Sequence, residues 1–299
     1  MRSIKFIFII LLVFISVNSL QAVGQSGKSG SAGRRNVTLN VIVHCPEGKA
    51  ISKDDFELYD QAVQQEVETF YKVDAGSRIV LMIDSSGDLR VESEILQKAV
   101  GSLINELYED DQMMIVGYNE NAEIIEDMTP DLKKLQTSAT KIIRKGFPNL
   151  FDALVAVTDA LEQQAKTGIE KRAIILITDG YDSESKTKFD VALKTLQEAN
   201  ILLYALKVAD RTRGALLRDK PKPPVVLEKL TGGTGGSIYP INKNEEAAKV
   251  ISEDLRKNWY RLTYSPVGVN SLNDRKLLIM THDKNVQLKI KDSHPGKYK

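Results

Sequence analysis

The sequence predicts a doubly wound α/β domain with a mostly parallel, six-stranded sheet, and an accessory β-unit formed by the two ends of the chain. Two segments in the middle, residues 78–83 (RIVLMI) and 173–177 (AIILI), are apolar without a break except for Arg78 at the start of the first, as expected of strands buried on both faces. Segments with helical spacing alternate with these strands, which favours a parallel sheet covered on both sides. The chain ends instead show a period of two, which is typical of strands with one buried face.

Residues 1–22 have the layout of a secretory signal peptide. Arg2 and Lys5 precede an apolar run at residues 6–15, and Ala22 offers a small residue for cleavage. A Gly/Ser-rich linker follows at residues 23–35. We therefore expect a secreted protein, or one held in the periplasm or cell envelope. The alternative is an uncleaved membrane anchor, but the run is shorter than the ~20 residues that a span needs, so we expect no stable membrane span after cleavage.

Residues 36–74 are predicted to form an N-terminal β segment. Apolar residues alternate from Val37 to Val43, a turn follows at Pro46 and Gly48, and residues 54–73 favour strand over helix. Residues 259–299 form the matching C-terminal β segment, with one strand near residues 260–264 and another near residues 286–290. Neither segment has enough strands to be stable alone, so we expect them to share one β-unit.

Residues 75–258 are predicted to form the α/β domain. After the first buried strand, a helix spans residues 91–107, a strand 113–116, a short edge strand 122–125, and two helices residues 132–143 and 150–161. After the second buried strand come a helix at 189–199, a strand at 201–208, a polar loop, a helix near 226–230, a short strand at 237–239 and a last helix at 245–258. The Gly-rich residues 232–236 follow a helix and enter a strand, so they predict a turn and no nucleotide-binding loop.

Composition and motifs exclude several functions. The net charge is +1, without the basic excess of a nucleic-acid-binding protein. Cys45 is the only cysteine, so no intramolecular disulfide forms. The three histidines lie in the β-rich ends, and neither a G-x-S-x-G nor an H-E-x-x-H motif is present. We therefore expect a protein that is not an enzyme.

Both buried strands end in aspartate. Ligands of doubly wound sheets lie beyond the carboxyl ends of the strands, where the strand order reverses. If the two strands are neighbours, Asp84, Ser86, Asp88 and Asp179 form one oxygen-rich cluster, of the kind that Mg²⁺ and Ca²⁺ prefer.

Three motifs resemble the von Willebrand factor type A domain. VLMIDSSGD resembles its first strand and D-x-S-x-S loop, ILITDG its fourth strand, and GFPNLFDAL the segment with its metal-binding threonine. The flanking SKDDFELYDQAVQQEVETF, LEKLTGGTGGSIYPI and WYRLTYSP resemble a bacterial family of exported proteins related to that domain. The resemblance runs from about Asn36 to the end of the chain.

The resemblance implies an adhesion-type metal site of two aspartates, two serines and a threonine, where the metal holds an acidic residue of a protein partner. Asp84, Ser86 and Asp179 match this set, but Asp88 replaces the second serine. Pro148, or Asn149 after a shift of one residue, replaces the threonine. We therefore expect a degenerate site that binds a divalent cation weakly, with Ca²⁺ at least as good as Mg²⁺, because Ca²⁺ tolerates irregular ligand shells.

Simpler roles are open for the same residues. Asp88 could cap the following helix, Ser86 could serve the turn, and Asp84 and Asp179 could accept bonds from backbone amides. Three converging carboxylates repel one another. We expect relief from a bound cation, a retained proton, or Asp88 turned away to its helix.

The sequence thus predicts an exported, non-enzymatic module that binds another protein through a degenerate metal-ion-dependent adhesion site. Two alternatives stay open: a metal-dependent hydrolase that uses Asp84, Asp88 and Asp179, and a structural component with a vestigial site. Residues 210–224 are predicted to be either a partner contact or a solvated loop, because they carry five basic residues: Arg211, Arg213, Arg218, Lys220 and Lys222.

Overall fold

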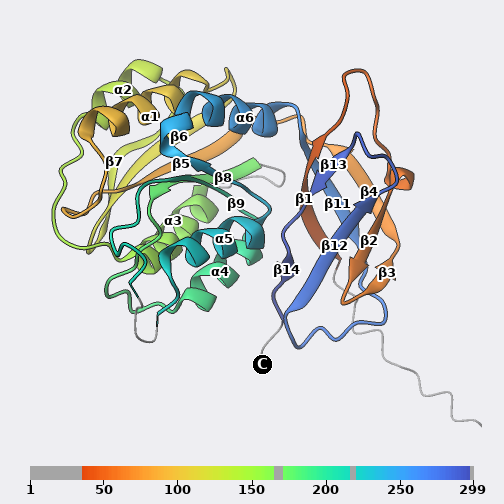
Figure 1. Cartoon of the computed structure of the whole chain (residues 1–299). Helices are drawn as coiled ribbons and strands as arrows, with labels where there is room; N and C mark the ends of the chain where they lie inside the picture. Colours follow the sequence, from red (N-terminus) through yellow and green to blue (C-terminus); the bar gives the residue numbers. More distant parts are fainter. Residues whose placement is uncertain (1–35, 165–170, 216–219, 297–299) are drawn as a thin grey trace, which may run out of the picture. The chain divides into compact units, whose positions relative to one another are not determined.

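The central sheet has six strands in the order β10–β9–β8–β5–β6–β7 (Figure 1). These strands are β5 (Ser77–Asp84), β6 (Gln112–Tyr118), β7 (Ala122–Thr129), β8 (Lys171–Thr178), β9 (Leu202–Lys207) and β10 (Ile238–Pro240). All neighbours are parallel except the edge strand β7, which runs antiparallel to β6. This computed structural model describes residues 36–164, 171–215 and 220–296, so the expected signal peptide and linker lie outside the described residues.

Helices cover both faces of this sheet (Figure 1). One face packs against α1 (Ser93–Asn105), α2 (Leu132–Ala139) and α6 (Asn244–Arg256), and the other against α3 (Leu150–Gln164), α4 (Phe189–Glu198) and α5 (Pro223–Thr234). Alternate residues of the central strands supply the two cores. In β5, for example, Leu81 belongs to the first core and Met82 to the second. The predicted doubly wound, mostly parallel six-stranded sheet is confirmed.

The two ends of the chain share an accessory β-unit. One sheet has the order β13–β1–β11–β4 and the other β14–β12–β2–β3. The N-terminal segment supplies β1 (Val37–His44), β2 (Phe56–Asp60), β3 (Val63–Gln65) and β4 (Val67–Lys72), and the C-terminal segment supplies β11 (Trp259–Tyr264), β12 (Arg275–Thr281), β13 (Gln287–Lys289) and β14 (Ser293–His294). β1 pairs with β11 over six residues, which confirms the expected shared unit.

Polar contacts join the accessory β-unit to the α/β part. Trp259 is fully buried, and its Nε1 donates to Oδ1 of Asn40 at 3.2 Å. The Nδ2 of Asn40 in turn donates to the carbonyl oxygen of Asn200, at 2.7 Å, in the turn before β9. The ammonium group of Lys291 lies 2.9 Å from the carbonyl oxygen of Gln197, and burial lowers the pKa of this lysine to about 7.

Three details differ from the sequence predictions. α2 ends at Ala139 with Thr140 as its cap, and the chain then turns so that Ile142 packs against the core. β12 carries apolar side chains on both faces, with Leu278 half exposed, so it lacks the period-two signal. Of the Gly-rich residues, 232–234 belong to α5, and only Gly235, at φ 89°, and Gly236 form the turn into β10.

Candidate functional site

The candidate site lies at the carboxyl ends of β5 and β8, which are parallel neighbours. The chain continues from β5 to β6 on one side and places β8 on the other, so this is the point where the strand order reverses. Asp84 is the last residue of β5, and Asp179 directly follows β8. Both side chains are fully buried, so their carboxylates need partners within the protein.

Arg211, from the loop after β9, supplies these partners. Its Nε lies 2.8 Å from Oδ2 of Asp179, and its Nη2 lies 3.0 Å from Oδ1 of the same residue and also bonds Oδ2 of Asp84. Its Nη1 lies 2.8 Å from Oγ of Ser86 and 2.5 Å from Oδ1 of Asp88. A guanidinium group has five N–H donors, and each donor here has an oxygen acceptor. The four predicted site residues are therefore brought together around an arginine.

The loop that carries Arg211 is fixed by its own backbone. The amide nitrogen of Arg211 donates to Oδ2 of Asp179 at 2.9 Å. Next to it, Oδ1 of Asp210 accepts from the amide nitrogen of Thr212 at 2.8 Å, which closes a tight turn. One residue earlier, Ala209 forms an isolated β-bridge with Arg90. The guanidinium is thus delivered to the cluster by an ordered turn.

Burial and charge set the protonation of the cluster. Burial lowers the pKa of Arg211, but the hydrogen bonds to Asp179 and the charges of Asp84, Asp179 and Asp88 outweigh it and raise this pKa, so the arginine stays charged. Burial raises the pKa of Asp84, and the positive charge of Arg211 opposes this rise. With all three carboxylates ionised, the cluster keeps two excess negative charges beside one guanidinium.

A buried hydroxyl chain supports Asp84 from below. The hydroxyl group of Tyr118 lies 2.9 Å from Oγ1 of Thr178, which donates in turn to Oδ2 of Asp84 at 3.2 Å. Burial raises the pKa of Tyr118 well above its usual value, so this phenol stays protonated. These hydrogen bonds hold the carboxylate in one orientation toward Arg211.

Two of the simpler roles considered for the site residues are present, and one is wrong. Asp84 accepts from a backbone amide, because the amide nitrogen of Ser86 donates to its Oδ1 at 2.9 Å, and Ser86 serves the turn because its Oγ donates to the same oxygen. The amide nitrogen of Tyr181 likewise donates to Oδ1 of Asp179, at 3.0 Å. Asp88 does not cap α1, because this helix begins at Ser93 and its N-cap residue is Glu92, four residues past Asp88. The side chain of Asp88 is 47% exposed and points to Arg211 instead.

The position of the lost threonine supplies no side-chain oxygen to the cluster. Pro148 is buried, and its carbonyl oxygen accepts from the amide nitrogen of Ser183 at 2.7 Å. The side chain of Asn149 accepts from the amide nitrogen of Glu184 at 3.1 Å and donates to the carbonyl oxygen of Glu120 at 3.3 Å. Both residues therefore connect loops beside the site.

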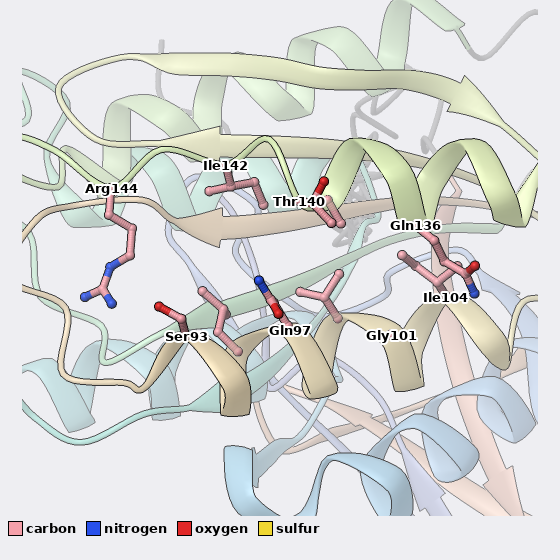
Figure 2. A pocket seen from close by; sticks show the side chains of 11 residues that line it. Ser93, Gln97, Gly101, Ile104, Gln136, Thr140, Ile142 and Arg144 are labelled. Carbon is pink, nitrogen blue, oxygen red and sulfur yellow. The ribbon is translucent and has the colours of Figure 1, made fainter.

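A second arginine links the site to a cavity. Arg144 donates from Nη1 to the carbonyl oxygen of Val91 at 2.9 Å and from Nε to that of Ser86 at 3.4 Å. It also lines a cavity of about 270 Å³ between α1 and the α2 region. Figure 2 shows Arg144 at the end of this cavity near Ser93, with Gln136 at the other end. The loop after β5 is thus braced by a different arginine on its far side.

The basic residues of the loop at residues 210–224 are not all at the surface, contrary to the prediction. Arg211 was expected to be a surface cation, but its side chain is only 5% exposed because it lies among the carboxylates. Lys220 donates to the carbonyl oxygen of Ser183. Arg213 is exposed, as a solvated loop predicts. Arg218 lies outside the described residues.

The oxygen atoms of the cluster are of the kind that binds a divalent cation, but Arg211 occupies the space between them. Carboxylate and hydroxyl oxygens are the ligands that Mg²⁺ and Ca²⁺ prefer, yet the guanidinium group of Arg211 fills the space that these oxygens enclose. In the described part of the chain, no group of three or more His, Cys, Asp or Glu side chains is arranged to hold a metal ion. A divalent cation therefore does not fit the site with Arg211 in place, and the weak binding of Ca²⁺ or Mg²⁺ that the sequence predicts is untested.

Comparison with known proteins identifies the domain. Residues 79–181 match the family model of the von Willebrand factor type A domain, and this span contains Asp84, Ser86, Asp88 and Asp179. The chain therefore carries a von Willebrand factor type A domain, as its motifs predicted. This class consists in general of non-enzymatic modules that interact with other proteins.

Several solved structures are similar to this chain, and the first described here has a TM-score that supports the same fold. A von Willebrand factor type A protein from Catenulispora acidiphila has a TM-score of 0.51 at 12% identity, over 85% of this chain and 74% of that chain. An aerotolerance-related membrane protein from Bacteroides fragilis gives 0.48 at 16% identity, over 61% of this chain and 100% of that one. The conserved hypothetical protein BatB from Bacteroides thetaiotaomicron gives 0.49 at 19% identity, over 61% and 98%. No curated protein matches this sequence.

Among the described residues, none of the helices is both long and apolar enough to cross a membrane.

Proposed function

We propose that this chain is an exported, non-enzymatic protein-binding module whose partner docks where the strands of the type A sheet end, around Asp88 and Phe147. The type A domain supports an interaction role. The observation that carries the location is the side chain of Phe147, which is 60% exposed beside the aspartate cluster. Exposed aromatic side chains held in a fixed position are frequent anchors of protein interfaces.

The backbone around Phe147 is fixed to the aspartate loop. The amide nitrogen of Lys145 donates to the carbonyl oxygen of Ser85 at 2.8 Å, and that of Gly87 donates to the carbonyl oxygen of Gly146 at 3.0 Å. The amide nitrogen of Phe147 donates to Oε1 of Glu120 at 3.2 Å. The exposed ring is therefore presented by a braced loop, which lowers the entropy lost when a partner binds.

Gly146 makes this loop conformation possible. Its φ is 65°, and a Cβ atom there would lie 2.2 Å from Oε2 of Glu120. Only glycine adopts this backbone conformation without strain and leaves room for the carboxylate. Gly146 therefore allows the loop conformation that holds Phe147 in place.

The contacts of the two buried aspartates of the cluster disfavour the hydrolase alternative. The carboxylate oxygens of Asp179 accept from Arg211 and from backbone amides, and those of Asp84 accept from Arg211, Ser86 and Thr178. A general base needs a free lone pair within reach of a substrate proton. We therefore keep the non-enzymatic role for this proposal.

Export belongs to the same proposal. It rests on the basic start, the apolar run at residues 6–15 and the Gly/Ser-rich linker. We expect cleavage after Ala22, which mass spectrometry of the mature N-terminus would detect. A chain that keeps Met1 in a membrane fraction would instead support the anchor alternative.

The docking surface is tested by site-specific photo-crosslinking in the native cell. A photoreactive phenylalanine analogue replaces Phe147 in one variant and Leu278 in another, because Leu278 is similarly exposed, at 53%, but lies on β12. We expect a defined protein adduct from position 147 and none from position 278. Phe147→Ser should also reduce co-purification of the captured partner at least about tenfold, as loss of an anchor residue does.

Adducts at both positions in equal yield would contradict the proposed surface, and so would an unchanged yield of partner with Phe147→Ser. The folded state of each variant is checked by its thermal midpoint. We expect that midpoint to be unchanged, because both replaced side chains are largely solvated.

A further inference from the structure

We propose that Arg211 is the resident cation of this type A site and stands where the adhesion-type site would hold a divalent metal ion. The two cations satisfy the same oxygens in different ways. A metal ion would coordinate them, whereas Arg211 donates one hydrogen bond from each of its five N–H groups. This inference goes beyond the proposed function, because it holds whether or not a partner docks on Phe147.

Arg211 links oxygens of separate loops, as a metal ion bound at this position would. Its guanidinium group joins oxygens from two separate segments: Asp84 at the end of β5 with Ser86 and Asp88 in the loop that follows, and Asp179 after β8. Arg211 itself comes from a third loop, after β9. One buried cation thus fixes three loops at the carboxyl end of the sheet.

The charges make a cation necessary at this point. Asp84 and Asp179 are fully buried next to each other, and two ionised carboxylates at such range are stable only with a compensating charge or a shared proton. The arginine supplies that charge without a free ion. Its side chain is 5% exposed, so it is held about as deeply as the carboxylates it serves.

Entry of a metal ion would require Arg211 to leave. The guanidinium would give up its contacts to four side chains, and the turn at Asp210 and Thr212 would have to open, because the amide nitrogen of Arg211 also bonds Asp179. The threonine oxygen of the adhesion-type site has no replacement here, since Pro148 has no side-chain oxygen and the side chain of Asn149 bonds Glu184 and Glu120 instead. The ligands available to a divalent ion would therefore be too few to offset the loss of the hydrogen bonds of Arg211.

We expect the oxygens around Arg211 to form a latent metal site once the guanidinium is removed. Removing the guanidinium by Arg211→Ala leaves an oxygen cage with three carboxylates. Adding Asp88→Ser restores the D-x-S-x-S pattern and reduces the carboxylates to two. We therefore expect the wild type to ignore divalent cations, and the double variant Asp88→Ser/Arg211→Ala to bind them.

The experiment measures heats of binding and thermal midpoints of the purified chain with EDTA, Mg²⁺, Ca²⁺ or Mn²⁺, each ion alone. For the wild type and for Arg213→Ala, whose exposed arginine lies in the same loop, we expect no heat and no shift. For the double variant we expect one ion bound per chain. At about 100 times the dissociation constant, this should raise the midpoint by about 5 °C. Adding Asp179→Ala should abolish the effect.

Two results would overturn the proposal. The first is a wild type whose midpoint rises in millimolar Mg²⁺ or Ca²⁺ and no longer does so after Asp179→Asn. The second is a folded double variant that binds none of the three ions. If the double variant does not fold, the wild-type measurement decides alone, because an unchanged midpoint with every ion supports a site already filled. Loss of partner capture by Phe147→Ser is measured separately, so failure of the proposed function leaves this result intact.

Discussion

Both carboxylate oxygens of Asp179 face Arg211. Oδ2 accepts from Nε at 2.8 Å and from the backbone amide of the same arginine at 2.9 Å, while Oδ1 accepts from Nη2 at 3.0 Å. This paired contact fixes the plane of the guanidinium as well as its position, because two parallel N–H groups meet two oxygens. Asp179 thus orients the arginine that neutralises Asp84.

The first prediction concerns the shape of the cation. Arg211→Lys keeps the charge but provides three donors at one point, which cannot reach oxygens on both sides of the cluster. We expect a loss of about 2 kcal/mol in the free energy of unfolding, measured by urea denaturation. Arg213→Lys, at an exposed position, should change it by less than about 0.5 kcal/mol. Equal stability of Arg211→Lys and the wild type would show that charge alone is sufficient.

The second prediction separates the buried carboxylate from the exposed one. Asp84→Asn removes the charge of one of the two fully buried carboxylates that Arg211 contacts and should cost about 3 kcal/mol or more in unfolding free energy. Asp88→Asn, at a side chain that is 47% exposed, should cost less than about 1 kcal/mol. Chemical denaturation of both variants under the same conditions makes the comparison. A larger loss for Asp88→Asn would mean that the outer contact dominates.

The third prediction is a pH dependence at the junction with the accessory β-unit. The Nε2 of His44 lies 3.0 Å from Oδ1 of the buried Asp254, and this hydrogen bond raises the pKa of His44 above 6.5. A raised folded-state pKa stabilises the fold fully below pH 6.5, and the contribution is lost as the pH rises through the folded-state pKa. We therefore expect the stability that His44 contributes to fall from about pH 5.5 to about pH 8.5, and we expect it to appear as a larger difference in thermal midpoint between the wild type and a His44 variant at the lower pH. The lowered pKa of Lys291 acts in the opposite direction, but it is common to both proteins and cancels in this difference.

His44→Gln should remove most of this dependence in that window. The control is His282→Gln, because His282 is exposed in a turn of the accessory β-unit. A midpoint difference between the wild type and His44→Gln that is the same at both pH values would contradict the assignment. So would a His44→Gln variant that keeps the full slope.

The fourth prediction uses one substitution at two glycines. A Cβ atom at Gly236 would lie 1.9 Å from the carbonyl oxygen of Leu203, whereas a Cβ at Gly101 in α1 meets nothing within 4 Å. Gly236→Ala should cost about 3 kcal/mol or more, because backbone must move. Gly101→Ala should stabilise the protein by about 0.5–1 kcal/mol, because alanine is the better helix former. Differential scanning calorimetry measures both, and equal effects would contradict the packing around Gly236.

The fold was predictable because its strongest signals are local. Unbroken apolar runs such as residues 79–83 identify central strands, and the aspartate at the end of each run marks the edge where ligands gather. β12 escaped notice because Leu278 is exposed although it is apolar, so neither periodicity was visible. The end of α2 was placed too late because Ile142 and Ile143 continue a helical pattern after the helix has ended.

The aspartates and the serine of the site could be predicted from the sequence, but the arginine between them could not. Asp84, Ser86, Asp88 and Asp179 stand at recognisable strand ends, but Arg211 stands 127 residues after Asp84 in a loop that contains four other basic residues. Nothing in the sequence distinguishes a buried arginine from an exposed one there. Repulsion among three carboxylates does indicate that a compensating group is needed, and the sequence suggests a metal ion, a retained proton or Asp88 turned away to its helix. A guanidinium from the same chain is the fourth way.

The pairing of β1 with β11 sets an order of events for folding. The two strands are separated by more than 200 residues, so β1 leaves the ribosome, and in an exported chain the translocation pore, long before its partner exists. Until then the apolar face of β1, with Leu39 and Val41, has no sheet to join. Closing so long a loop is slow, and an unpaired apolar strand is prone to aggregate meanwhile. A chain of this design would benefit from a chaperone that binds its first strand until the last segment arrives.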